Sequence, residues 1–361
     1  MKHLYTLLFS ILLLGCASHQ KDSENIELSF LDEYVIPIGE EYEETLIGGI
    51  SGIDYVNGFY YLIVDDSKNP RFYKAEITLQ NKEISDLKII DVVSFKDHPF
   101  YKENALDLES IIVDISSGNI VLTSEGKIKD EKNPLLFVSN SKGKFIKNIP
   151  LPERFSAISE AQPIHNKTLE GLSRSFDDKG YWTAMELPLK IDGEEPKYLE
   201  ANSPIRITYF DKEKEKATKE FVYQLSPITK PFIGDFNLNG VTDILEFKPN
   251  HFFMIERIYQ SGYGAYGNIV RVYHAYADEN TTNSLAINSL KEINYIPLKK
   301  ELILDFDSFK DNLTENIVDN IEGITFGPIL PNGNKTLLFV SDDNFQVYGK
   351  QLNQFLLFEI K

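Results

Sequence analysis

Acidic residues recur along the chain in short motifs that could place oxygen ligands around a cation. Glu109, Glu170, Asp243 and Glu322 are each followed by a small or aliphatic residue and a strand-like run. Residues 50–53 repeat the pattern with a serine in place of the acid, and the copies begin 58 to 79 residues apart. Carboxylate oxygens suit calcium or magnesium, whereas few histidines and a single cysteine argue against zinc.

A second acidic residue follows each motif after a turn signal and a strand-like run. These residues are Asp65 or Asp66, Glu125, Glu186, Glu256, and Asp342 or Asp343. An antiparallel hairpin brings the start of its first strand beside the end of its second strand, so both acids of a copy are expected at the same end. If the hairpins are arranged around one axis, all of these carboxylates are expected to form a ring at one mouth of a central channel. The alternative is structural, with each acid accepting hydrogen bonds from the backbone of the neighbouring sheet.

Basic residues are few, so those near the acids are candidates for holding an anionic group. Arg257 directly follows Glu256, Arg71 lies near a predicted third strand, and Arg174 follows the third acidic motif. A guanidinium can bind a phosphate or carboxylate through two parallel hydrogen bonds, and it can also simply pair with neighbouring acids. Substrate binding and surface pairing therefore stay open for Arg71 and Arg174, and Arg257 is the best candidate for a functional role.

Residues 235–246 fit the spacing of an EF-hand calcium loop, with Asp235, Asn237, Asn239 and Asp243 among the ligand positions. Prolines on both sides argue against the helices that flank an EF-hand. The segment resembles instead the calcium loop that FG-GAP propeller repeats place between strands. Two interpretations stay open, a local calcium site and a solvated turn rich in Asn and Asp.

The elements that must position these residues are short strands separated by turn signals. After each acidic motif we expect a second strand, a third strand and, in four copies, a fourth strand. The second strands are expected at 60–64, 120–123, 181–185, 252–255 and 337–341, and the third at 72–77, 135–139, 205–210, 269–274 and 355–360. The fourth strands are expected at 88–95, 144–151, 220–225 and 301–306. The fifth copy lacks a fourth strand, which the N-terminal run 28–37 would supply.

Five four-stranded units, the last completed by the N-terminus, predict an all-β fold, a β-propeller closed into a ring. A sixth blade could lie within the longer third or fourth copy, and a β-sandwich is the alternative. Closure by the N-terminal strand removes sheet edges that would otherwise invite aggregation.

The composition narrows the classes of function. The chain has 361 residues, 42% of them hydrophobic, and a formal net charge of −18, so it is globular and an unlikely partner for nucleic acid. Neither a Gly-x-Ser-x-Gly elbow nor a phosphate-cradling Gly-rich loop occurs. The single cysteine lies at position 16, outside the predicted domain, which excludes a cysteine nucleophile there.

The N-terminal segment indicates export and a lipid anchor. A positive Lys2 precedes an apolar run that is too short to span a bilayer, and Leu-Leu-Gly-Cys16 resembles a bacterial lipobox. We therefore expect a signal peptide over 1–15, lipidation of Cys16, a polar tether over 16–27 and a domain over 28–361. The expected location is a bacterial membrane, at the outer membrane or cell surface; a plain signal peptide is the alternative.

Nine segments, in order, resemble the phytase-like family described as having esterase-like activity. They are GGISGIDY (48–55), DLESIIV (107–113), LTSEG (122–126), TLEGLS (168–173), AMELPL (184–189), GVTDILEF (240–247), FFMIER (252–257), NIEGITFGP (320–328) and LLFVSDDN (337–344). The resemblance implies a propeller related to calcium-dependent phytases, in which channel-mouth carboxylates hold calcium ions that bind phosphate and activate water.

Carried over residue by residue, the resemblance implies roles for the acids at both hairpin positions. The candidate metal ligands are Glu109, Glu170, Asp243, Glu322 and Asp342, with Asp235, Asn237 and Asn239 in the separate loop. The candidate catalytic residues are Glu125, Glu186, Glu256 and Arg257, and the candidate substrate-binding residues are Arg71, Arg174 and Arg257.

These observations predict an exported, lipid-anchored, monomeric hydrolase that uses calcium to hydrolyse a phosphate or carboxylic ester at the channel mouth. One alternative is a non-enzymatic binding module of the cell envelope with a glycan, peptide or protein partner. A second is that the acids only stiffen the ring. In each case the membrane is reached through the lipid anchor alone.

Overall fold

The computed structural model describes residues 26–96 and 98–361, which form almost entirely antiparallel β-sheet. Five four-stranded sheets are the blades of a propeller. Blade 1 holds β4 (Ile50–Val56), β5 (Phe59–Val64), β6 (Arg71–Gln80) and β7 (Glu83–Ser94), and blade 2 holds β8 (Leu108–Val113), β9 (Ile120–Ser124), β10 (Leu135–Ser139) and β11 (Phe145–Ile149). Blade 3 holds β12 (Leu169–Arg174), β13 (Gly180–Met185), β14 (Pro204–Asp211) and β15 (Lys216–Gln224). Blade 4 holds β16 (Asn237–Lys248), β17 (His251–Gln260), β18 (Asn268–Tyr276) and β19 (Lys299–Asp305), and blade 5 holds β20 (Asn320–Phe326), β21 (Thr336–Asp342), β22 (Asn353–Ile360) and β1 (Leu28–Ile36).

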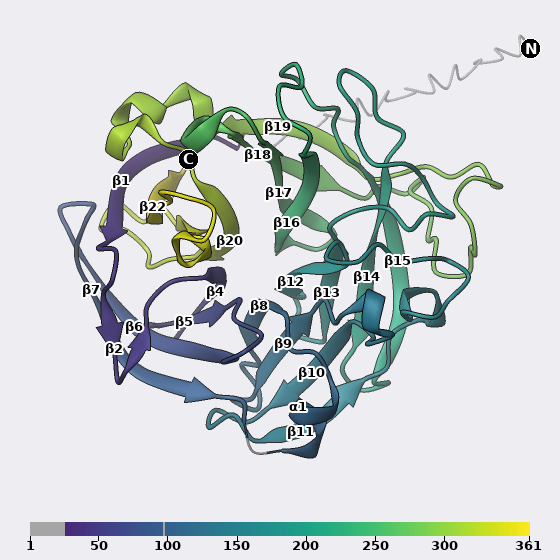
Figure 1. Cartoon of the computed structure of the whole chain (residues 1–361), viewed down its shortest axis with the longest axis horizontal. Helices are drawn as coiled ribbons and strands as arrows, with labels where there is room; N and C mark the ends of the chain where they lie inside the picture. The colour runs from purple at the N-terminus through teal and green to yellow at the C-terminus, as the bar shows by residue number, and fades with distance from the viewer. Residues whose placement is uncertain (1–25, 97) are drawn as a thin grey trace, which may run out of the picture.

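The five blades close into a ring (Figure 1). Each innermost strand contacts the innermost strand of the next blade, from β4 through β8, β12 and β16 to β20, and β20 contacts β4. The predicted five-bladed propeller is therefore confirmed, and the part of the chain that the structure describes contains no sixth blade.

The N-terminal strand completes the last blade, as expected. Strand β1 pairs antiparallel with β22, from Leu28 opposite Ile360 to Ile36 opposite Asn353. In Figure 1 the purple β1 accordingly lies beside the yellow β22. The outer edge of blade 5 is thus made by residues more than 300 positions away in the sequence, so closure of the ring requires both ends of the domain.

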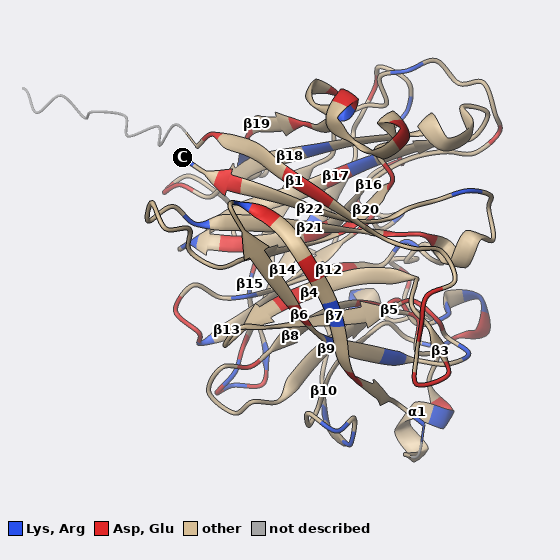
Figure 2. Ribbon diagram, turned by 90° about the vertical axis from the view of Figure 1, so that its left-hand side faces the viewer, with Lys and Arg blue, Asp and Glu red and all other residues tan. Residues whose placement is uncertain are grey.

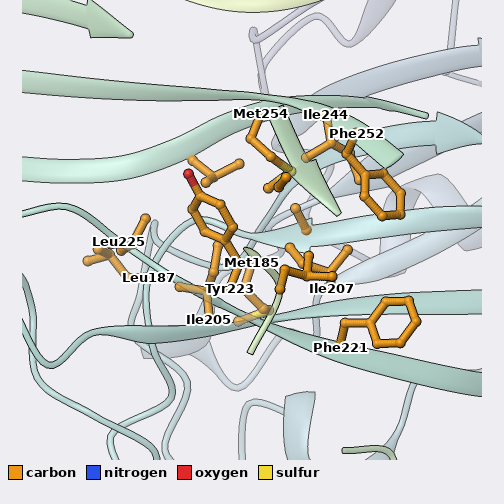
Figure 3. Close-up of a cluster of buried hydrophobic side chains, with 14 of the residues drawn as sticks. Met185, Leu187, Ile205, Ile207, Phe221, Tyr223, Leu225, Ile244, Phe252 and Met254 are labelled. Carbon is orange, nitrogen blue, oxygen red and sulfur yellow. The ribbon is translucent and has the colours of Figure 1, made fainter. Parts of the chain in front are cut away.

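Apolar cores fill the spaces between neighbouring blades. Between blades 3 and 4, Met185, Ile207, Phe252 and Met254 belong to one buried cluster (Figure 3). Trp182 packs into the same cluster, with its ring centroid 5.1 Å from that of Phe252. Burying each such side chain stabilises the fold by roughly 1.5–3 kcal/mol. Because each blade is packed on both faces, its position is fixed. The loops at the ends of the blades therefore start from fixed positions.

Apart from the connection 277–298 between β18 and β19, the longer connections lie on the face where the inner strands begin. They carry the hairpin β2 (Glu41–Tyr42) and β3 (Thr45–Leu46), helix α1 (Pro99–Glu103) and the 3-10 helices η1 (Ile128–Asp130), η2 (Glu153–Phe155), η3 (Gly264–Tyr266), η4 (Phe306–Ser308), η5 (Lys310–Asn312), η6 (Thr314–Asn316) and η7 (Asn344–Gln346). The C-terminus lies on the opposite side from β3 and α1 (Figure 2). Among the described residues no helix is long and apolar enough to cross a membrane.

Closure by β1 predicts that alanine substitutions at two nearby isoleucines, Ile36 and Ile38, change the free energy of unfolding by very different amounts. Ile36 is 3% exposed in the core between blades 5 and 1, whereas Ile38, two residues beyond the strand register, is 58% exposed. Ile36→Ala should lower the free energy of unfolding by about 2–4 kcal/mol, because it leaves a cavity at the closure. Ile38→Ala should change it by less than about 0.5 kcal/mol. Urea unfolding measures both values, and equal effects would contradict closure by β1.

Candidate functional site

A β-bulge at the start of each inner strand sets the first ring of side chains. In every blade the pairing between the first and second strands shifts near the start of the first strand. The residues at the bulge are Ser51, Glu109, Glu170, Thr242 and Glu322. A bulged residue is unpaired and its strand bends, which presents Glu109, Glu170 and Glu322 at the mouth of the channel. Ser51 Oγ and Thr242 Oγ1 instead donate to the backbone oxygens of Leu108 and Ile321 in the neighbouring inner strands.

The same register identifies a second ring at the ends of the second strands. The residue before each bulge pairs with Val64, Ser124, Met185, Glu256 or Ser341. The residues that follow these partners are Asp65, Glu125, Glu186, Arg257 and Asp342. The structure thus selects Asp65 over Asp66 and Asp342 over Asp343, and it places an arginine where blade 4 was expected to supply an acid.

Carboxylates from blades 1, 2 and 3 converge into two groups that share Glu109. One carboxylate oxygen each of Asp65, Asp107 and Glu109 lie within 4.8 Å of one another, and so do one each of Glu109, Glu125 and Glu170. We call these five residues the acidic cluster. Glu186, Glu322 and Asp342 act on the cluster electrostatically from blades 3 and 5. The predicted convergence of acids at one mouth is therefore present, although not with every predicted member.

Two cations face these acids. Arg257 Nη1 lies 3.1 Å from Glu322 Oε1 and donates to Asn320 Oδ1, while Arg257 Nη2 lies 3.5 Å from Glu186 Oε1. Lys167 Nζ lies 3.3 Å from Glu186 Oε2. Neighbouring acids, foremost Glu322 for Arg257 and Glu186 for Lys167, outweigh the effect of burial and raise the pKa of both cations. Both side chains stay charged, yet they are too few to balance the eight carboxyl groups.

Burial raises the pKa of the acidic cluster. The pKa values of Glu109, Glu125, Glu170 and Asp65 lie well above the usual range, first because burial disfavours the charged form and then because neighbouring carboxylates repel it. Burial raises the pKa of Glu322 to about 7, although Arg257 opposes the rise. The site therefore holds protons near neutral pH unless another cation takes their place.

The donor set fits a hard divalent cation. All ligand atoms in the two groups are carboxylate oxygens, which is the chemistry that calcium prefers. One oxygen, Glu125 Oε2, is buried and makes no hydrogen bond, although leaving such an atom unpaired costs about 1–3 kcal/mol. The other oxygen, Oε1, accepts a hydrogen bond from the backbone N–H of Thr168, which orients the carboxylate. An oriented acid with one unused oxygen is suited to binding a cation.

Two predicted site residues of blade 4 do not join the cluster. Asp243 lies one residue past the bulge and accepts hydrogen bonds from the N–H groups of Leu172, Ile244 and Ile324, at 3.2, 2.8 and 3.0 Å. It ties blades 3, 4 and 5 together, and burial raises its pKa to about 8. For Asp243 the structural alternative is therefore the one observed.

Glu256 points between blades 3 and 4 because successive residues of a strand face opposite sides. Its carboxylate accepts hydrogen bonds from Tyr223 Oη at 2.6 Å, Lys300 Nζ at 2.5 Å, Ser226 N at 3.0 Å and Asn239 Nδ2 at 2.9 Å. All its main acceptor positions are thus used. The prediction of a catalytic Glu256 at the mouth is corrected to a structural role.

The calcium-like loop at 235–246 is not a loop. Strand β16 begins at Asn237 and pairs with β17 along its length. Asn237 Oδ1 accepts from Gln260 Nε2 at 3.1 Å, Asn239 Nδ2 donates to Ser226 O at 2.7 Å, and Asp235 is exposed ahead of the strand. Side chains two apart on an extended strand are about 6.6 Å apart and cannot wrap one ion. Asp235, Asn237 and Asn239 therefore form no common ligand set.

Two of the three predicted arginines make structural contacts away from the acidic cluster. Arg71 donates to Asp66 Oδ2 at 2.8 Å and to Leu46 O at 2.9 Å, which anchors the β2–β3 hairpin. Arg174 lies at the far end of β12, about 13 Å along the strand from Glu170, and pairs with Asp54. Only Arg257 lies at the mouth.

Three residues of the site were not identified from the sequence. They are Asp107, Lys167 and Asn320. Asp107 and Asn320 each precede a bulged glutamate by two residues, and this repeated spacing is the signal that could have found them. Lys167 carries no such signal. The predicted lipidation site Cys16 lies outside the described residues.

Metal-free protein should lose stability as the pH rises from about 5 to about 8. The folded state keeps a proton on Glu322, whose pKa is about 7 instead of 4.5, and the unfolded state releases it. This contribution is present below about pH 4.5 and is lost as the pH rises through about 7, a loss of roughly 3 kcal/mol for this residue. Thermal unfolding in excess chelator should show a lower Tm at the higher pH, and Glu322→Gln should shrink the difference. The same Tm at both pH values would contradict this electrostatic arrangement.

One of three comparisons with known proteins identifies the family. No curated protein matches the chain. Among solved structures it is similar to the Dos1 propeller (8% identity, covering 86% of this chain and 68% of that chain, TM-score 0.35), to Kuenenia stuttgartiensis hydrazine synthase (9%, 81% and 64%, 0.39) and to exo-β-1,3-galactanase from Phanerochaete chrysosporium (10%, 90% and 63%, 0.46). The chain thus spans about two thirds of the length of these structures, and at such TM-scores the likenesses carry no argument about activity. The family model for Phytase-like, described as "Esterase-like activity of phytase", matches residues 45–345, and the chain belongs to that family.

Proposed function

We propose that the protein is a calcium-assisted hydrolase of a phosphate or carboxylic ester, acting at the mouth of the propeller. The observation that carries the proposal is the pair of carboxylate groups sharing Glu109, with a buried unpaired oxygen on Glu125 and Arg257 beside them. Membership of a family described by esterase-like activity supports it. A binding platform would have no need to bury so many acids around one point.

The acidic cluster, Asp65, Asp107, Glu109, Glu125 and Glu170, would hold the calcium. When bound, calcium would polarise the ester and lower the pKa of a bound water. Arg257 is the anion-holding group, since its Nε is buried without a hydrogen-bond partner while its two other nitrogens are held by Glu186, Asn320 and Glu322. Glu186 thus positions Arg257 rather than acting on the substrate.

Glu322 is the candidate general base. Burial places its pKa at about 7, which is close to the optimum for accepting a proton from water near neutral pH. Asn320 Nδ2 donates to Glu322 Oε1 at 2.8 Å and fixes the orientation of the carboxylate. The other oxygen, Oε2, is left for the proton.

The proposal includes export and anchoring through Cys16. Strand β1 starts opposite Ile360, and its last residue, Ile36, lies at the face where the inner strands begin. The chain therefore enters the domain from the face opposite the acidic cluster, where the C-terminus also lies (Figure 2). A lipid attached ahead of residue 26 would leave the mouth pointing away from the membrane and open to a soluble substrate.

A binding module remains a second candidate because the loops around the mouth expose large apolar side chains. Leu199, Ile233 and Tyr348 are 62%, 65% and 79% exposed. Apolar side chains gathered at one face are typical of interaction sites. This candidate predicts calcium binding without turnover of any ester.

Calorimetric titration with calcium tests the ligand assignment. Glu109→Gln removes the carboxylate shared by both groups and should weaken calcium binding by at least about tenfold. Asp235→Asn, which removes an exposed acid of the EF-hand-like segment, should leave the affinity unchanged and serves as the matched control. Weakening by Asp235→Asn alone would move the calcium site to residues 235–246.

Ester turnover tests the chemistry. On a panel of 4-nitrophenyl phosphates and carboxylic esters, excess chelator should abolish activity, and Glu322→Gln should lower kcat by about 10²-fold or more. Glu256→Gln disturbs a carboxylate between the blades and should lower Tm more than kcat. Full activity in chelator, or a Glu322→Gln variant with unchanged kcat, would refute this mechanism.

A further inference from the structure

A cavity of about 560 Å³ lies beside the acidic cluster, between the loops of blades 1 and 2. Its walls come from the β5–β6 and β9–β10 connections, from the segment around helix α1 and from the loop before β12. Asp107 lines this cavity and also belongs to the acidic cluster, where its carboxylate lies within 4.8 Å of those of Asp65 and Glu109. A ligand in the cavity would therefore reach the proposed calcium ligands directly.

The cavity is basic, in contrast to the rest of the protein. Lys68, Lys96 and Lys127 line it, and Asp107 is the one acid among its described lining residues. Lys127 pairs with Asp130 at 2.6 Å, at an exposed position on the outside. Lys68 and Lys96 are exposed at the cavity, and no ion pair between described residues involves either, so both side chains are free to turn toward a ligand. In a chain of net charge −18 this is a marked local reversal of sign.

A polar group without a partner also lies in the cavity wall. His165 Nδ1 is buried and makes no hydrogen bond within the protein. Leaving a buried nitrogen unpaired is unfavourable, and a ligand in the cavity would pair with this atom once the imidazole ring turned toward it. The volume exceeds that needed for a single phosphate ion and falls in the range of small-molecule sites, so the occupant would be an organic anion.

We propose that this cavity binds an anionic group, a carboxylate or a phosphate, that the substrate carries in addition to the ester held at the acidic cluster. The inference rests on the proposed function and narrows its substrate class to esters of small organic anions. Arg71 and Arg174 do not line this cavity: Arg71 is held by contacts to Asp66 and Leu46, and Arg174 lies at the far end of β12. Lysines bind an oxyanion as point charges and tolerate either geometry, so both anion types suit the cavity.

Direct binding is measured by calorimetry on the calcium-loaded protein with succinate and with inorganic phosphate as separate probes. The double variant Lys68→Gln/Lys96→Gln should weaken binding of the preferred probe by at least about tenfold. The control Lys179→Gln/Lys214→Gln removes the same charge from exposed lysines of blade 3 at the opposite face and should not. Calcium affinity and Tm should be unchanged in both variants. Absence of binding to both probes, or equal binding by the Lys68/Lys96 variant, would overturn the inference; the probe that binds identifies the anion.

A pair of esters separates this inference from the proposed function. The KM for mono-4-nitrophenyl succinate, which carries a free carboxylate, should rise at least about tenfold in the Lys68/Lys96 variant, while the KM for neutral 4-nitrophenyl butyrate stays unchanged. Equal effects on both esters would refute the cavity as the anion site while leaving the hydrolase intact. If no ester is turned over but succinate or phosphate binds through the lysines, the hydrolase proposal fails and the binding site stands.

Discussion

Burial of like charges around one channel mouth is the constraint on which the rest of this structure depends. Carboxylates moved out of water lose hydration, and each raises the pKa of the next. On flexible loops, the repulsion between these carboxylates would drive the loops apart. Here the closed ring of blades and the apolar packing between them hold each acid where a bulge and a strand end place it. The stability of the propeller thus offsets the repulsion, and the clustered acids could hold an added cation.

The fold could be predicted because its signals are local. Strand-length apolar runs, turns and a repeated acid position define hairpins, and hairpins define blades. The residues that make up the site could not be predicted, because they depend on the position of the β-bulge in each inner strand. In blades 3 and 5 the bulged acid precedes Gly171 or Gly323, whereas in blade 4 Asp243 itself occupies the glycine position and Thr242 the bulge. A one-residue offset then exchanges Glu256 for Arg257 at the mouth.

The segment 235–246 shows how pairing overrides a local pattern. Its short polar side chains suit a turn, yet Leu238, Val241 and Ile244 are buried and pack between blades 3 and 4. Asn239, also fully buried, donates to Ser226 O and Glu256. Asn239 thus finds partners that only the neighbouring strands provide, and the sequence alone does not reveal those partners.

The basic cavity and the acidic cluster would couple the proposed binding of an anion to that of a cation. Without a cation, an anion entering the cavity would meet Lys68 and Lys96 in its wall and also Asp107, the member of the acidic cluster that lines the cavity. Any ionised carboxyl group of the cluster would repel that anion. A divalent cation in the cluster would weaken this repulsion, so cation and anion binding would strengthen one another by the same factor. The arrangement therefore favours a substrate that contacts both regions at once, because only such a ligand benefits from the full coupling.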